Sequence, residues 1–532
     1  MFSCHCQNDP NLPVDDPNGA PPPHTNSTQC LRFNVALDQH LVRSFRAFQF
    51  TTADFIDARK SSPSFESRPV EGLLALLRAD LELKDSGLGE PLDISFLFHD
   101  ITSSQLELVC RVMSGEEPSR EIRHLRPRGL GRLDVSQRSC FYRSLGLCSS
   151  LRCLDLKETA LPTSDLPLLS AALLFNSSLE TLRLVGSSNF ADAELLDEFR
   201  AFGRAAAHLR LLFIKEVDWT LAVFRVFLDG ISSVGCPESL VFRNIPDLVP
   251  SLPSLVPMLT GGLHELKLSL FSETSLVEPS CIETFSAALG NSTSLSKLSL
   301  QVALPQPLIL QGLHQNTSLT SLSAHLVSHP HQQLMQMLPP FFGPSSLRTL
   351  HLKIDMDQLS SPLLEEALSL GLISTPRLKT LKLELRDVSD SGVLLANVAS
   401  QLYRCSSLTR LAISPRIADT AAYASLIARM PLLRDLDLKH LGLSAGHLSA
   451  IAEVLPFSSS LRTLDLRLNL CEGAWPHFLL AVLQNHSLEH LLLSPSILQQ
   501  LDFDQILQHL AINRRSRYLR FCSLFDLLQP GR

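Results

Sequence analysis

The chain has few of the features that mark membrane, secreted or nucleic-acid-binding proteins. No apolar run approaches the roughly 20 residues that a membrane-spanning helix needs, and residues 1–23 lack the basic start and apolar stretch of a signal peptide. Charged residues make up only 19% of the sequence, and the net charge of −7 is mild. We therefore expect neither a membrane nor a nucleic acid as partner.

The sequence also lacks the short motifs of common enzymes. It contains no Gly-x-x-x-x-Gly-Lys-Ser/Thr loop, no His-Glu-x-x-His, no paired Cys-x-x-Cys and no Gly-x-Ser-x-Gly. Residues 4–6, Cys-His-Cys, offer too few ligands for a structural zinc. His325, His329 and His331 crowd one segment, where a solvated turn is favoured over metal binding or pH sensing. We expect no enzymatic activity, no cofactor and no metal.

The cysteines and the glycosylation sequons give no sign of secretion. The 12 cysteines are scattered, several at repeat positions where an apolar side chain is expected, which is typical of reduced thiols used as small hydrophobes. Asn-x-Ser/Thr sequons occur at Asn26, Asn176, Asn291, Asn316 and Asn485. All but the first recur at one place in the repeat, which favours a structural role over glycosylation. We expect the protein to be cytoplasmic.

What the sequence does have is a repeated pattern, Leu-x-x-Leu-x-Leu, with a mean period of about 28 residues. The clear copies stand at 151–156, 179–184, 209–214, 263–268, 295–300, 347–352, 378–383, 408–413, 433–438, 461–466 and 488–493, and degenerate copies at 237–242 and 319–324. The fourth and sixth positions alternate with mostly polar neighbours, so each copy predicts a short strand that points two apolar side chains inward. Such a strand is stable only when stacked copies pair in parallel.

The rest of each period predicts a helix. Ser361 and Pro362 suit the N-cap and first turn of a helix, and residues 389–402, 420–430 and 444–455 carry apolar side chains at helical spacing. A full helix needs more arc length than a short strand, so the helices should lie outside and the array should curve. The predicted fold class is α/β, a solenoid (horseshoe) with a parallel concave sheet and convex helices.

Residues 172–184 read Ala-Leu-x-x-Asn-x-Ser-Leu-x-x-Leu-x-Leu, a phrase that resembles the ribonuclease-inhibitor-like class of leucine-rich repeats. The resemblance covers roughly residues 140–495 and implies a leucine-rich-repeat solenoid. The turn asparagine of the class is kept at Asn469 but is replaced elsewhere, as at Thr159, Ser187 and Leu441. We therefore expect an irregular array, and the class itself serves many unrelated binding tasks.

Four parts of the chain are predicted from these patterns. They are a disordered or weakly helical N-terminal tail (1–65), an N-terminal cap with degenerate repeats (66–150), the leucine-rich-repeat array (151–495) and a C-terminal cap (496–532). Residues 92–98 are expected to include a first degenerate strand. Caps are expected because a solenoid must cover the apolar faces of its terminal repeats.

The concave strand face is the default docking surface of such an array. Its outward positions are mildly basic in the middle of the array and mixed or acidic near the C-terminal end. The predicted partner-binding residues are Arg183, Phe213, Lys215, Lys267, Lys297, His351, Lys353, Lys382, Asp435, Asp437, Asp465 and Arg467. Their charges should guide the register of a protein partner, which we expect the chain to bind as a monomer.

Two other segments suggest chemistry. Arginines crowd residues 120–143 and face only Glu121 and Asp134, which fits either recognition of a carboxylate or phosphate or a solvated loop. The arginines are Arg120, Arg123, Arg126, Arg128, Arg132, Arg138 and Arg143. Cys153 and Asp155 match the Cys-x-Asp of a bacterial ubiquitin-ligase family that also carries leucine-rich repeats, but they fall inside a repeat strand, where a catalytic thiolate is not expected.

The favoured function is a non-enzymatic scaffold that recognises a macromolecular partner through its concave face. One alternative is a ubiquitin-ligase adaptor or a secreted effector that uses the repeats for target choice. Another is a GTPase-activating protein, which would need an Arg or Asn on a rim loop, with Asn189 and Asn469 as candidates.

Overall fold

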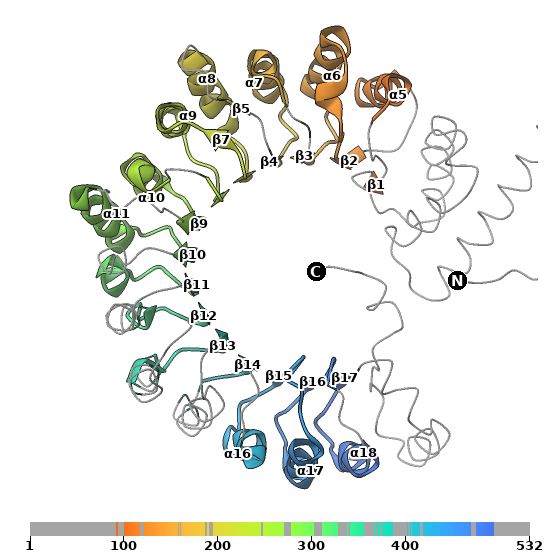
Figure 1. The fold of residues 1–532 in the computed structure, drawn as a ribbon, viewed down its shortest axis with the longest axis vertical. Helices are drawn as coiled ribbons and strands as arrows, with labels where there is room; N and C mark the ends of the chain where they lie inside the picture. The colour runs from red at the N-terminus through yellow and green to blue at the C-terminus, as the bar shows by residue number, and fades with distance from the viewer. Residues whose placement is uncertain are drawn as a thin grey trace, which may run out of the picture. The chain divides into compact units, whose positions relative to one another are not determined.

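In the computed structural model the repeat motifs pair side by side as one parallel sheet (Figure 1). The structure describes residues 92–93, 101–116, 122–157, 159, 161–186, 189–190, 195–245, 248–270, 278–302, 311–327, 338, 341–355, 366, 368, 370–372, 375–386, 402, 405, 407–414, 419–469 and 475–493. All of these lie within one compact unit, Leu73–Arg532. The predicted N-terminal tail (1–65) and C-terminal cap (496–532), and residues 4–6, lie outside the described residues.

Within the residues that the structure describes, the sheet has 15 strands, and each pairs with the next copy along the chain. They are β1 (Leu92–Asp93), β2 (Ile122–Leu125), β3 (Cys153–Lys157), β4 (Thr181–Val185), β6 (Leu211–Lys215), β8 (Ser239–Arg243), β9 (Glu265–Leu270), β10 (Lys297–Val302), β11 (Ser321–Val327), β12 (Thr349–Asp355), β13 (Thr380–Arg386), β14 (Arg410–Ser414), β15 (Asp435–Asp437), β16 (Thr463–Asp465) and β17 (His490–Leu492). The sheet therefore begins before residue 151, at the strand expected within residues 92–98. A separate two-stranded pairing joins β5 (Asn189–Phe190) to β7 (Asp218–Trp219).

The leucine spacing sets both the register and the core. Successive motifs pair at matching positions, for example Leu154 with Leu182 and Leu350 with Leu381. From Leu154 to Leu493, the fourth and sixth residues of every motif are no more than 5% exposed. Each strand thus buries the side chains at its fourth and sixth motif positions against the next repeat. A strand this short is stable only with such burial. The predicted leucine-rich-repeat solenoid is confirmed.

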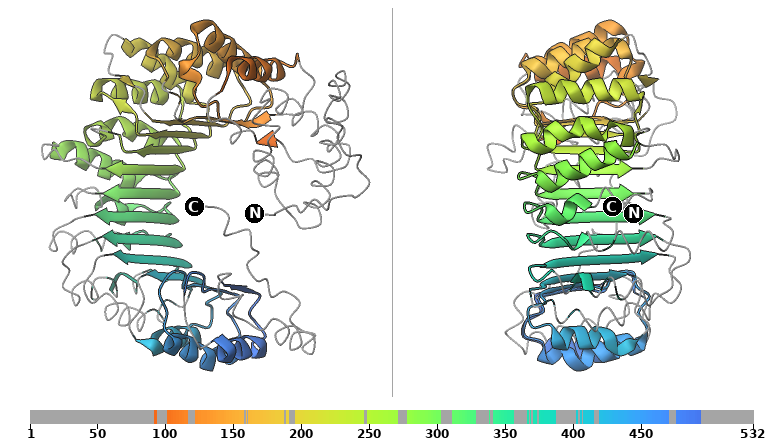
Figure 2. Two further views of the ribbon diagram at one scale, coloured as in Figure 1. Left: turned by 45° about the vertical axis from the view of Figure 1, so that its right-hand side comes forward. Right: turned by 90° about the vertical axis from the view of Figure 1, so that its left-hand side faces the viewer.

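Helices cover the outer side of the array and strands line the inner side (Figure 1), and the strands lie across the array one beside another (Figure 2). The helices are α5 (Ser103–Met113), α6 (Val135–Leu147), α7 (Leu166–Phe175), α8 (Leu196–Ala206), α9 (Leu221–Val234), α10 (Val256–Gly261), α11 (Pro279–Asn291), α16 (Thr420–Arg429), α17 (Ala445–Val454) and α18 (Trp475–Gln484). The helices predicted over 420–430 and 444–455 are confirmed as α16 and α17. Most of those predicted after Ser361 and over 389–402 lie outside the described residues.

The expectation of a full α-helix in every repeat is wrong between β8 and β9. There the outer element is a 3₁₀-helix, η4 (Val249–Leu255), followed by the short helix α10. Pro253 explains the difference, because a proline inside a helix removes an N–H donor and clashes with the preceding turn.

An asparagine holds the turn between helix and strand before β4. The Nδ2 of Asn176 donates to the carbonyls of Leu145 at 2.5 Å and Cys148 at 3.0 Å, both in the preceding repeat. Its Oδ1 accepts the main-chain N–H groups of Ser178 at 2.9 Å and Leu179 at 2.7 Å. The side chain therefore joins two repeats while remaining buried.

Asn316 and Asn485 make the same contacts, but Asn291 does not. Asn291 is exposed at the end of α11, and Ser292 takes the turn position, where its hydroxyl donates to the Leu259 carbonyl at 2.7 Å. The prediction that Asn291 shares the place of the other sequons is thus wrong by one residue. For Asn176, Asn316 and Asn485, burial explains the conspicuous Asn-x-Ser/Thr pattern without glycosylation.

Replacing Asn176 by Ala should lower the free energy of unfolding of the surrounding repeats by at least about 2 kcal/mol, because buried carbonyl and amide groups lose their partners. The matched control is Asn291→Ala, which changes the same residue type at an exposed position and should stay within about 0.5 kcal/mol of wild type. Urea denaturation measures both values. Equal stability of the two variants would contradict the structural role of the turn asparagine.

Candidate functional site

The strand face opposite the helices carries the residues predicted to meet a partner. Their side chains occupy the positions between the buried leucines, on strands β4, β6, β9, β10, β12, β13, β15 and β16. The exception is Arg467, which directly follows β16. The structure therefore brings these residues to one face but spreads them over many repeats.

Near the first of these strands, Arg183 on β4 lies opposite Phe213 on β6 in the sheet register. The Arg183 guanidinium carbon is 6.0 Å from the centre of the Phe213 ring, within reach of a cation–π contact. Lys215, two residues on, forms an ion pair with Glu216 at 2.9 Å. Val241 continues the row on β8 and is buried.

At β9, the predicted cation Lys267 pairs with a carboxylate of its own strand. Its Nζ lies 2.8 Å from Glu265 Oε1, and the hydroxyl of Ser239 donates to Glu265 Oε2 at 2.9 Å. Burial raises the pKa of the Glu265 carboxyl, but the hydrogen bonds from Lys267 and Ser239 and the charge of Lys297 outweigh it, so the pKa lies below its ordinary value. Glu265 is therefore ionised and offsets part of the local positive charge.

A second cluster spans β11 to β13. His351 lies opposite Lys382 in register, and both side chains reach Glu384, the lysine Nζ at 2.5 Å and the histidine Nε2 at 3.3 Å. Burial and the charge of Lys382 lower the pKa of His351, so its ring is neutral at neutral pH. Lys353 Nζ lies 2.9 Å from His325 Nε2. Of the histidine trio, only His325 lies within the described residues.

The acidic end of the face is less open than expected. Asp435 is 2.7 Å from Arg410, and the carboxylate of Asp437 accepts the main-chain N–H of Lys439 at 3.0 Å. Asp465 was expected to face a partner, but it is only 6% exposed and accepts hydrogen bonds from Arg467 at 2.7 to 3.1 Å. Because Arg467 folds back over it, Asp465 is unsuited to direct contact.

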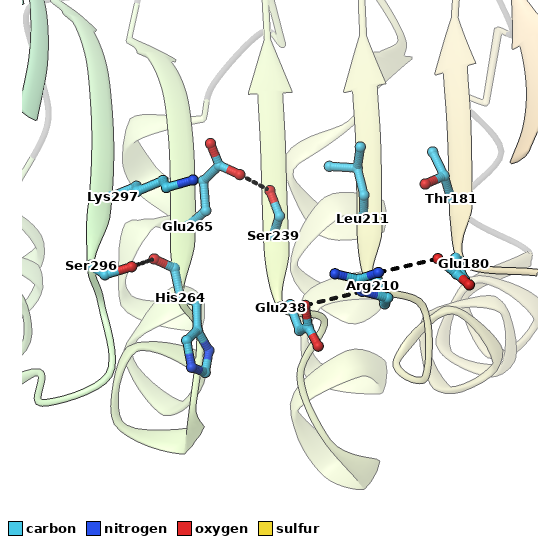
Figure 3. A pocket seen from close by; sticks show the side chains of 10 residues that line it. All are labelled: Glu180, Thr181, Arg210, Leu211, Glu238, Ser239, His264, Glu265, Ser296 and Lys297. Carbon is cyan, nitrogen blue, oxygen red and sulfur yellow. Dashed lines mark hydrogen bonds and ion pairs between the residues drawn. The ribbon is translucent and has the colours of Figure 1, made fainter. Parts of the chain in front are cut away.

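A groove of about 400 Å³ opens beside β4 to β10, at the edge where the strands begin (Figure 3). Arg210 lies between Glu180 and Glu238 there, with each nitrogen–oxygen distance 3.2 Å. Lys297, one of the predicted residues, also lines it. The lining is about half polar and half apolar, and Arg210 is paired with the carboxylates of both Glu180 and Glu238.

This edge was not singled out from the sequence. The residue after the first leucine of each motif forms a row along it, which we call the edge row. Its members are Arg152, Glu180, Arg210, Glu238, His264, Ser296, Thr320, Arg348, Lys379, Thr409, Arg434, Arg462 and Glu489. The signal was present in the sequence as a change of charge at one motif position, from alternating signs to mostly positive.

The arginine-rich segment is not a single solvated loop, because part of it is regular secondary structure and one of its arginines is buried. Residues 122–147 form β2, the 3₁₀-helix η1 (Leu130–Arg132) and α6. Arg138 is buried with its Nε 2.7 Å from Asp165 Oδ2, and Arg126 Nε lies 3.8 Å from Asp155. Arg123, Arg132 and Arg143 are exposed, and Arg120 and Glu121 lie outside the described residues. At least Arg138 is thus part of the core.

Asn469 also has a structural role. It is fully buried, its Oδ1 accepts the N–H groups of Leu441 and Leu443, and its Nδ2 donates to the carbonyl of Leu438 at 2.8 Å. It cannot orient a water molecule on a bound nucleotide. The side chain of Asn189 lies outside the described residues.

Cys153 sits half-buried within strand β3, the geometry of a sheet residue. Within the part of the chain that the structure describes, no cluster of His, Cys, Asp or Glu side chains could hold a metal ion. Nor is any of the described helices both long and apolar enough to span a bilayer.

No protein-family model matches the chain. Among solved structures, it is similar to an internalin from Listeria monocytogenes, at 15% identity over 83% of this chain and 96% of that one, with a TM-score of 0.35. It is also similar to the yeast complex of Rad7 and Elc1, at 14% identity over 80% of this chain and 96% of that one, with a TM-score of 0.41. Likeness at this level does not bear on the partner of this chain.

Proposed function

We propose that the chain is a non-enzymatic scaffold, of the ribonuclease-inhibitor-like class, that binds a protein partner on its inner strand face as a monomer. The observation that supports it is a continuous parallel sheet whose cations Lys267, Lys353 and Lys382 stand on β9, β12 and β13 between buried leucines. A fixed sheet presents such side chains in one register, so that complementary charge can orient a partner. A ubiquitin-ligase adaptor or a delivered effector would use the same face, so both are special cases of this proposal.

Reversing charge on the inner face should change what the protein binds. The test variant carries three substitutions, Lys267→Glu, Lys353→Glu and Lys382→Glu. In a pull-down analysed by mass spectrometry, we expect it to recover about tenfold less of the binding proteins than wild type does, because like charges across an interface cost several kcal/mol. The control variant is Arg143→Glu, Arg204→Glu, Arg429→Glu, which makes the same change in net charge on exposed helix positions. If the inner-face variant recovers the same proteins as wild type, the inner face is not the docking surface.

The GTPase-activating alternative is tested without a variant, because Asn469 is buried. Wild-type protein that fails to stimulate hydrolysis across a panel of small GTPases would remove that alternative. Stimulation would instead contradict the non-enzymatic proposal.

A further inference from the structure

The edge row changes character along the array. In the first repeats it alternates in sign, and neighbours pair: Arg152 with Glu180 at 3.8 Å, then Arg210 with Glu180 and with Glu238 at 3.2 Å. The same motif position is basic from β12 to β16, apart from Thr409. The same motif position thus shows two charge patterns along the array. In the first repeats, neighbouring residues at this position have opposite charges and pair with one another. From β12 to β16, the charged residues at this position are all positive.

The basic members are neighbours in space. The N–H of Lys379 donates to the carbonyl of Arg348 at 2.8 Å, the N–H of Thr409 to that of Lys379 at 2.8 Å, and the chain continues through Arg434 to Arg462 at 2.7 Å for each step. Adjacent strands lie about 4.8 Å apart. Four cationic side chains, interrupted once by Thr409, therefore line the edge where the strands begin.

Two further arginines, Arg377 and Arg410, are exposed beside this row. We call the six cations together the basic edge: Arg348, Arg377, Lys379, Arg410, Arg434 and Arg462. In the described residues from 344 to 350, 375 to 381, 407 to 411, 430 to 436, 458 to 464 and 485 to 491, the only carboxylates are Asp435 and Glu489. The first pairs with Arg410 at 2.7 Å and the second with Arg462.

Like charges on neighbouring strands are destabilising, so their concentration here is explained best by an anion that binds them. Arginine matches carboxylates through its planar fork of N–H donors, and Arg410 and Arg462 already hold carboxylates of this chain. Two large apolar side chains, Leu432 at 51% and Phe457 at 86% exposure, lie in the segments that lead into β15 and β16. Leu432 stands two residues before Arg434, and Phe457 stands five residues before Arg462.

We propose that the basic edge binds an acidic segment of a protein partner, one that places Asp or Glu against the cations and apolar residues against Leu432 and Phe457. An interrupted acidic segment suits this surface better than a nucleic-acid backbone. The phosphates of a nucleic acid recur at every nucleotide and would pass close to Asp435 and Glu489, whereas a peptide can place neutral residues there. The edge-row cations are distinct from the inner-face residues of the proposed docking surface, and Arg410, which pairs with Asp435, lies where the two surfaces meet.

The test uses full-length protein and a fluorescein-labelled peptide of mixed Glu and Leu, with fluorescence anisotropy as the readout. Its Gln-and-Leu counterpart and a single-stranded DNA of matched charge serve as comparisons. We expect the Glu peptide to bind, and to bind more weakly as the salt concentration rises. The triple variant Arg348→Glu, Lys379→Glu, Arg434→Glu should raise the Kd for this peptide about tenfold or more. The charge-matched variant Arg143→Glu, Arg204→Glu, Arg429→Glu should change it less than about twofold.

Circular dichroism checks that each variant is folded, and single Arg434→Gln and Lys379→Gln substitutions repeat the measurement should the triple variant not fold. Equal affinity for the Glu and Gln peptides overturns the proposal. So does equal weakening by the charge-matched variant. Tighter binding of the DNA, lost in the same edge variant, would overturn it in favour of a nucleic-acid site.

Discussion

Replacing Asp165 by Ala should destabilise the repeats around α6 and α7 by about 3–5 kcal/mol, the range for breaking one side of a buried ion pair. Asp165 and Arg138 are 2% and 6% exposed, and Asp165 Oδ2 lies 2.7 Å from Arg138 Nε. The Tyr142 hydroxyl donates to the same oxygen at 3.2 Å, and Arg138 also donates to the Leu133 carbonyl. Without the carboxylate, a guanidinium would remain buried without its counter-charge.

The array provides a control with the same geometry at the surface. Arg410 Nε and Asp435 Oδ2 are also 2.7 Å apart, but these side chains are 68% and 34% exposed. Asp435→Ala should therefore cost less than about 1 kcal/mol. Urea denaturation gives the global values, and hydrogen exchange at α6 and α7 detects local opening, which a repeat array permits.

The double variant Arg138→Met, Asp165→Leu should recover most of the loss, because it leaves no buried charge. An Asp165→Ala variant no less stable than Asp435→Ala would refute the stabilising role of the pair.

The arginine-rich segment also shows a limit of sequence reasoning, since nothing local distinguishes Arg138 from its exposed neighbours. Its partner stands 27 residues away, in the next repeat.

The periodic features of the fold were predictable because they depend on local spacing. The leucine pattern predicted the parallel register, and the polar residues between the leucines predicted which side chains share the inner face. The prolines of η4 were visible too, but the helical period of the neighbouring repeats outweighed them in the prediction. In that repeat, proline overrides the helical pattern of its neighbours.

The site was less predictable, because its properties arise between repeats. Lys267 and Lys382 read as free cations in sequence, yet each lies beside a carboxylate two residues away, Glu265 or Glu384. A carboxylate two residues away on the same strand either pairs with the lysine or points elsewhere, and side-chain conformation decides which. The edge row escaped notice for a different reason, since its pattern is seen only when all motifs are aligned at one position.

A single added methyl group at the crossing of α8 and α9 is expected to be strongly destabilising, because the two helix backbones approach each other closely there. At the crossing of α8 and α9, Gly203 faces Gly230, and a Cβ on Gly203 would lie 2.2 Å from the Phe227 carbonyl oxygen. A Cβ on Gly230 would lie 2.3 Å from the Arg200 carbonyl oxygen. Because the obstructing atoms are helix backbone rather than flexible side chains, one helix must move as a body.

Gly203→Ala should therefore destabilise the array by about 3 kcal/mol or more, at the upper end of the cost of overpacking. The loss should exceed the gain of helix propensity from Gly to Ala, about 1 kcal/mol. Gly261→Ala is the matched control, because it also lies in a helix and a Cβ there would meet nothing within 4 Å. That variant should be neutral or slightly stabilised in thermal and urea unfolding. The sheet hydrogen bonds fix the spacing of the strands, so in the Gly203→Ala variant we expect α8 and α9 to separate and their amides to exchange hydrogen faster. Unchanged exchange together with unchanged stability would show that the crossing is not closely packed.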